Sequence, residues 1–175
     1  VIAAALFTTT TIAQSKTSFG LRAGVNFQNL NGKDEDGNKL DNKLKTGFNA
    51  GVNAEIPVGI DFYVQPGLLF STKGAKFDDA NGEIKRNISY IEIPVNFLYK
   101  PELGEGRMLL GFGPYAAFAV GGNTEIGNNK NDIEFGNEVG ESKRFDAGAN
   151  LLAGYEFSNR LSFQLNAGLG LINMY

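Results

Sequence analysis

Long stretches of this chain alternate between apolar and polar residues, and this alternation limits the possible folds more than any other feature. From Phe19 to Gln28, every second position is apolar, whereas the positions between carry Gly, Arg, Asn and Gln. A period of two over about ten residues predicts a long β-strand with two different faces. The apolar face is the more uniform one, so we expect it to contact lipid while the polar face fills the inside of a barrel.

Seven such stretches occur, each long enough to cross a bilayer as a tilted strand. They cover residues 18–29, 46–56, 61–73, 88–100, 107–121, 144–157 and 161–173. Long charged loops alternate with short turns between them, which is typical of outer-membrane barrels whose short turns face the periplasm. Outward aromatic residues gather near both ends of the strands, as the two membrane interfaces favour. They are Phe19, Phe62, Tyr99, Phe112, Phe157 and Phe163 near the short turns, and Phe27, Phe48, Phe70, Phe118 and Phe145 near the long loops.

The predicted fold is therefore all-β, an antiparallel up-and-down transmembrane β-barrel. Eight strands are expected, although only seven can be recognised, because single-chain bacterial barrels have an even number of strands. We expect the eighth strand to follow Tyr175. The weaker alternative is that residues 1–13 form it, since the threonine run in that segment does not alternate.

Residues 1–13 resemble the end of a secretory signal peptide. An apolar run is followed by Thr11 and Ala13, two small residues at the spacing of a cleavage site, which predicts a mature chain that starts at Gln14. The predicted organisation is a signal-peptide remnant over 1–13 and one outer-membrane barrel domain over 14–175. The predicted location is the bacterial outer membrane.

The composition excludes several kinds of site. The chain has no Cys and no His, which removes thiolate chemistry, the usual general base and the usual zinc ligands. Its net charge of −3 argues against a nucleic-acid binder. Residues 34–45 begin like a calcium-binding EF-hand loop, but Lys39 and Lys45 stand where Gly and a bidentate Glu are needed. We expect no catalytic residue, no cofactor and no metal.

Seven charged residues fall on the inward face and are candidates for a structural charge network in the lumen. They are Arg22, Glu55, Lys73, Glu92, Arg144, Asp146 and Glu156. A buried charge must be paired, so we predict that Arg22 meets Glu55 in the periplasmic half and that Lys73 meets Glu92 near the outer end. Inward glycines leave room for tyrosines across the lumen, and a barrel of about eight strands has space for side chains but not for an aqueous channel.

Several short motifs occur along the chain in a specific order. They are VQPGLLF at 64–70, YIEIPV at 90–95, GPY at 113–115, DAG at 146–148, GYE at 154–156 and GLGLIN at 168–173. In these motifs the chain resembles the small outer-membrane β-barrel family common in Bacteroidetes-type bacteria, the PorT-like or "porin family" barrels. The resemblance implies a fold and a location, and it implies little chemistry.

Two classes of function remain. The first is a non-enzymatic structural or interaction component, or an accessory subunit of a larger envelope complex. Such a protein would contact outer-membrane lipid and other outer-membrane or secretion-complex proteins. The second is a small porin-like channel for small solutes. The expected filling of the lumen favours the first class.

Overall fold

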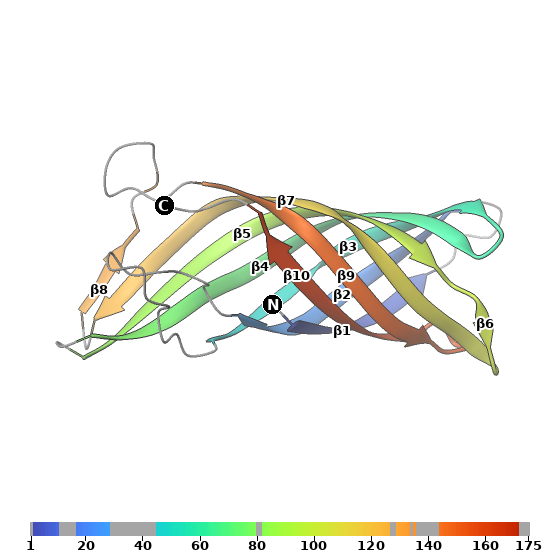
Figure 1. The fold of residues 1–175 in the computed structure, drawn as a ribbon, viewed down its shortest axis with the longest axis horizontal. Coiled ribbons are helices and arrows are strands. Elements are labelled where there is room, and N and C mark those ends of the chain that lie inside the picture. Colours follow the sequence, from blue (N-terminus) through green and yellow to red (C-terminus); the bar gives the residue numbers. More distant parts are fainter. Residues whose placement is uncertain are drawn as a thin grey trace.

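The computed structural model describes residues 2–10, 17–28, 45–79, 82–126, 129–133, 135 and 144–171. Among them there is no helix with the length and apolar character needed to span a membrane. Eight strands lie side by side and form a closed ring (Figure 1). The ring strands are β1 (Ile2–Thr10), β2 (Ser18–Gln28), β3 (Lys45–Gly59), β4 (Phe62–Asp79), β5 (Gly82–Tyr99), β7 (Gly106–Ile126), β9 (Phe145–Glu156) and β10 (Ser162–Gly170).

All neighbours in the ring pair antiparallel, and the ladder between β5 and β7 closes it. The predicted antiparallel up-and-down barrel is thus confirmed, and seven ring strands correspond to the seven alternating stretches. Two short strands, β6 (Glu102–Leu103) and β8 (Asn129–Asp132), pair with the two ends of β7 outside the ring. The segment 74–87, predicted as a loop, instead continues the β4–β5 ladder as far as the pair Asp79 and Gly82.

The eighth position in the ring belongs to β1. This strand pairs with β2, where Thr10 lies opposite Phe19, and with β10 on its other side. It is the alternative that the sequence analysis ranked second. The physical reason for this position of β1 is that, without it, backbone groups along the edges of β2 and β10 would be unpaired. The acidic segment 34–41 and residues 172–175 lie outside the described residues.

Three tight turns define one end of the barrel, which we call the short-turn end. They connect β3 to β4, β6 to β7 and β9 to β10. Each turn contains one residue in the left-handed region, with φ of 60° at Asp61, 64° at Gly104 and 64° at Arg160. The opposite end, where β8 lies, is the long-loop end (Figure 1).

Burial of the side chains follows the predicted alternation. On β2, Leu21 is 60% exposed whereas the adjacent Arg22 is 9% exposed. The same alternation places large apolar side chains outside on all of the ring strands from β2 onward. Buried amides face inward on the same strands, among them Asn26, Asn49, Asn53, Gln65, Asn96 and Gln164. The molecule therefore has an apolar outer wall and a mostly polar core, which is the reverse of a soluble barrel.

Outward aromatic rings contact one another at the ends of neighbouring strands. Near the short-turn end, the ring centre of Phe62 lies 4.9 Å from that of Tyr99 and 5.5 Å from that of Phe97. Near the long-loop end, the ring centres of Phe48 and Phe70 are 5.9 Å apart. Aromatic rings at these two levels fit the two interfaces of a membrane.

Candidate functional site

The candidate site is the lumen, whose layers can be followed along β5. From the short-turn end, alternate residues present a charge, an apolar side chain, an amide, a proline, a second charge and two further apolar side chains. They are Lys100, Leu98, Asn96, Pro94, Glu92, Tyr90 and Ile88. These seven positions are buried or nearly so, whereas the positions between them are more exposed. Each layer is completed by residues from the other strands.

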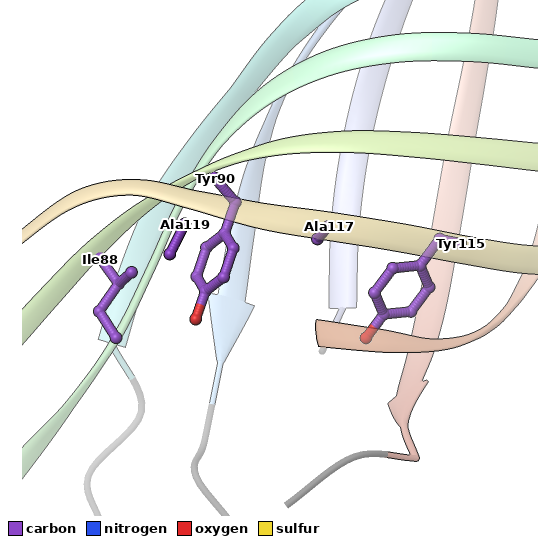
Figure 2. Close-up of a cluster of buried hydrophobic side chains, with 5 residues drawn as sticks. All are labelled: Ile88, Tyr90, Tyr115, Ala117 and Ala119. Atoms are coloured by element: carbon purple, nitrogen blue, oxygen red, sulfur yellow. The ribbon is translucent and has the colours of Figure 1, made fainter. Parts of the chain in front are cut away.

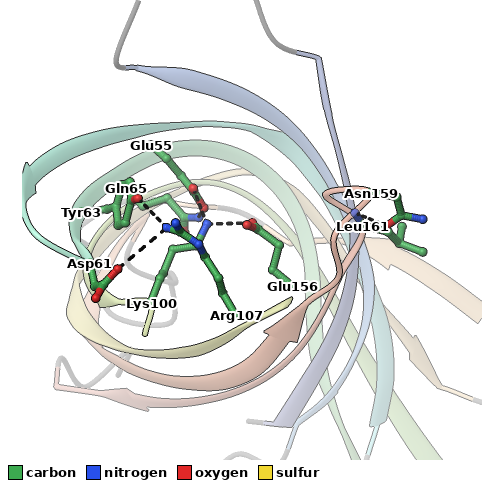
Figure 3. Close-up of polar contacts among 9 residues, drawn as sticks. All are labelled: Glu55, Asp61, Tyr63, Gln65, Lys100, Arg107, Glu156, Asn159 and Leu161. Carbon is green, nitrogen blue, oxygen red and sulfur yellow. Dashed lines mark hydrogen bonds and ion pairs between the residues drawn. The ribbon is translucent and has the colours of Figure 1, made fainter. Parts of the chain in front are cut away.

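The layer at the short-turn end is centred on Lys100, which follows β5 and is 3% exposed. Its Nζ lies 2.7 Å from an oxygen of Glu55 on β3 and 2.7 Å from an oxygen of Glu156 on β9 (Figure 3). Gln65 donates a hydrogen bond of 3.0 Å to the second oxygen of Glu55. We call Glu55, Lys100 and Glu156 the mouth triad. It holds one cation between two carboxylates, so it carries a net negative charge.

A second cation lies beside the mouth triad. Arg107, at the start of β7, donates a hydrogen bond of 2.9 Å to the Tyr63 hydroxyl, and its guanidinium lies 4.0 Å from Asp61. Tyr63 contacts both cations, since the centre of its ring also lies 5.1 Å from Lys100 Nζ. A cavity of about 460 Å³ at this end is lined by Lys100, Arg107 and both glutamates of the triad.

An apolar layer lies next to the mouth triad. Leu98, Leu109 and Leu152 are at most 4% exposed and pack together, with Tyr63 against them. We call these three residues the leucine plug. Gly111 lies opposite Leu98 on one side and Leu152 on the other, so its missing side chain leaves the space in which the two leucines meet. Apolar side chains in this position exclude hydrated ions from the lumen.

Adding a methyl group at Gly111 should destabilise the barrel by about 1–3 kcal/mol through overpacking. A Cβ at this position would lie 2.5 Å from Leu98 Cδ2 and 2.9 Å from the Phe97 carbonyl oxygen. The matched control is Gly121→Ala on the same strand, where a Cβ would meet no atom within 4 Å. Denaturant titrations of Gly111→Ala and Gly121→Ala in lipid vesicles measure both. Equal stability of the two variants would contradict the packing of the leucine plug.

The middle of the lumen holds a second charge cluster. Lys73 on β4 forms ion pairs with Glu92 on β5 and, at 3.4 Å, with Asp146 on β9. Tyr115 donates a hydrogen bond of 3.4 Å to Asp146, and its ring centre lies 4.8 Å from Lys73 Nζ. A small cavity of about 60 Å³ lies in this cluster, and Arg22, Lys73 and Glu92 are among the residues that line it. Two cations and two carboxylates make this central cluster neutral, and the cavity has space for a few water molecules only.

A second apolar layer covers the central cluster toward the long-loop end. Ile88, Tyr90, Tyr115, Ala117 and Ala119 form a buried group, with Ala119 and Tyr90 exposed by only 0% and 1% (Figure 2). Two side chains from the segment after β8, Ile133 and Phe135, pack against this group. The polar centre of the lumen thus has an apolar group on each side of it along the barrel axis.

The structure brings some of the predicted lumen charges together and separates others. Lys73, Glu92 and Asp146 meet in the central cluster, and Glu55 and Glu156 meet through Lys100. The sequence predicted that Arg22 meets Glu55, but the strand register places these two residues at different levels of the lumen. In the β2–β3 register Glu55 lies opposite Ser18, whereas Arg22 lies opposite Gly51 and lines the central cavity.

Arg144 also differs from the expectation. It precedes β9 and is exposed, with its guanidinium 5.3 Å from the ring centre of Phe135 and a hydrogen bond of 3.5 Å to the carbonyl of that residue. By alternation, Arg144 should lie on the inward face. The strand begins only at Phe145, however, so the alternation of inward and outward side chains does not extend to Arg144.

Two charged residues of the mouth were missed. Lys100 and Arg107 are the end residues of the predicted strands 88–100 and 107–121, and they were not counted among the inward charges. The sequence does contain a signal for them. Lys100 is one position from outward Tyr99 and Arg107 is three positions from outward Leu110, and an odd separation places a residue on the inward face.

Comparison with known proteins gives one positive result. The family model described as outer membrane protein beta-barrel domain matches residues 12–175. No curated protein and no solved structure gives a significant match. The match covers all of the ring except β1, and the family fits the apolar wall and the polar lumen described above. The chain belongs to the outer membrane protein beta-barrel domain family.

Proposed function

We propose that this outer-membrane barrel is a non-enzymatic component with a filled lumen, which acts as a structural or interaction protein or as an accessory subunit of a larger envelope complex. One observation carries the proposal: apolar layers lie on both sides of the central charge cluster. A solute crossing the lumen would have to displace the leucine plug and the group around Tyr90. It would also have to break the ion pairs of the mouth triad and of Lys73.

The finer features of the proposal come from the sequence. The short-turn end faces the periplasm, as in other barrels of this kind. Cleavage after Ala13, which the sequence pattern predicts, would remove β1 from the ring and leave the edges of β2 and β10 unpaired. N-terminal sequencing of the exported protein tests whether residues 1–13 are removed or stay in the barrel. The motifs at 64–70 and 90–95 support the PorT-like group within the wider family. The proteins that the barrel contacts are other outer-membrane or secretion-complex proteins.

Conductance in planar bilayers tests the filled lumen. The wild-type protein should give no stable single-channel current. A variant in which Leu98, Leu109 and Leu152 are all changed to Gly removes the plug but keeps the central cluster and the group around Tyr90, so it should also give no stable current while its barrel remains folded. Folding is checked by circular dichroism and by the heat-dependent shift in gel mobility that closed barrels show. A reproducible current from the wild-type protein would favour the porin-like channel instead.

A further inference from the structure

The outer wall contains an apolar hollow near the short-turn end. It has a volume of about 490 Å³ and lies over β2, β3 and β4. Its outward side chains are Phe19 and Leu21 on β2, Val52 and Ala54 on β3, and Pro66 and Leu68 on β4. Ala54 is the smallest of them and lies on the middle strand, so the larger side chains of the flanking strands form two ridges beside it. We call this hollow the β3 groove.

We propose that the β3 groove holds one acyl chain of a membrane lipid. The wall in which it lies is the surface that faces lipid in a barrel of this family, so the groove is continuous with an established lipid interface. A volume of about 490 Å³ is within the range of about 300–1,000 Å³ that is usual for small-molecule sites.

The position of the groove in the membrane also fits an acyl chain. It begins at Phe19, the second residue of β2, near the aromatic residues of the short-turn end, and it reaches Leu68, the seventh residue of β4. A membrane strand crosses the hydrocarbon core in about 9–11 residues. The groove therefore runs from one interface to about the middle of the bilayer, which is the depth of a single leaflet.

The chemistry of the lining favours a lipid chain over a protein segment. Asn53 is the only lining residue with a polar side chain, and that side chain is 8% exposed and belongs to the inward face. The outward face of the groove offers no side-chain hydrogen bond. Segments of membrane proteins usually associate through close backbone packing together with such bonds. A flexible acyl chain needs only apolar contact.

Filling the groove tests the proposal. The wild-type barrel and Ala54→Phe are refolded in vesicles of phosphatidylethanolamine and phosphatidylglycerol, transferred to a mild detergent and examined by native mass spectrometry. We expect the wild type to keep one phospholipid and Ala54→Phe to lose it. The matched control is Ala149→Phe, because Ala149 is an exposed alanine of the outer wall and lies on β9, opposite β3 in the ring of eight strands. This control should keep the lipid.

A second measurement locates the chain directly. Phospholipids with a photoactivatable group in the acyl chain should form cross-links mainly within residues 52–54 and 66–68. Loss of the lipid from Ala149→Phe as well as from Ala54→Phe, or cross-links spread evenly onto β9, would show ordinary annular lipid and overturn the proposal. So would a wild type that keeps no phospholipid, or one that keeps a protein partner at this site. The bilayer current of the protein is independent of these outcomes.

Discussion

Replacing Lys100 by Met is expected to destabilise the barrel by about 3–5 kcal/mol, because it leaves the carboxylates of buried Glu55 and partly buried Glu156 without their cation. Lys100 Nζ lies 2.7 Å from both Glu55 and Glu156, and the lysine side chain is 3% exposed. Urea titrations in lipid vesicles, followed by circular dichroism, measure the loss. The effect should be among the largest of any single substitution in the lumen, since one side chain here serves two partners.

The origin of the loss can be separated from lost packing. The triple variant Lys100→Met, Glu55→Gln and Glu156→Gln removes the stranded charges and should be clearly more stable than Lys100→Met alone. Lys130→Met on exposed β8 should change stability little. Arg22→Met combined with Glu55→Gln should be additive, since these residues belong to different clusters. A triple variant less stable than Lys100→Met would refute the triad.

The faces of the strands could be predicted from the sequence because a period of two fixes the side of every residue once one is assigned. Leu21, Val95 and Leu151 were placed outside by this rule, and they are 60%, 41% and 60% exposed. The strand ends were less predictable. Beyond the membrane no lipid selects an apolar face, so the continuation of β4 and β5 past residue 74 carries no clear alternation although its ladder continues.

The ion pairs of the lumen were harder to predict than its faces. Sequence reasoning paired charges on neighbouring strands, which was correct in placing Lys73 beside Glu92 and wrong for Arg22 with Glu55. In a narrow barrel a long side chain can reach across the lumen. Lys100, after β5, meets carboxylates from β3 and β9, and neither strand is its neighbour in the ring. Such contacts depend on strand register and curvature, which local patterns do not contain.

Replacing Leu151 by Arg is expected to cost about 2–4 kcal/mol, because it places a charge against lipid near the middle of the bilayer. Leu151 is 60% exposed on the outer wall and lies near the middle of β9 (Phe145–Glu156). The Leu151 side chain makes no contact in the lumen, so the cost of the arginine arises from its contact with lipid and not from lost packing. Refolding titrations in lipid vesicles give the free energy of unfolding of the variant and of the wild type.

Val58→Arg is the matched control for depth. Val58 is 55% exposed, close to the value for Leu151, but it lies at the short-turn end of β3. An arginine there can reach the interface, so the expected cost is only about 0–1 kcal/mol. In water the two sites would be equivalent, because both side chains are exposed to a similar extent on the same kind of surface. Equal costs at Leu151 and Val58 would therefore contradict the placement of this wall in a bilayer, whereas a clear difference would measure how deep Leu151 lies within it.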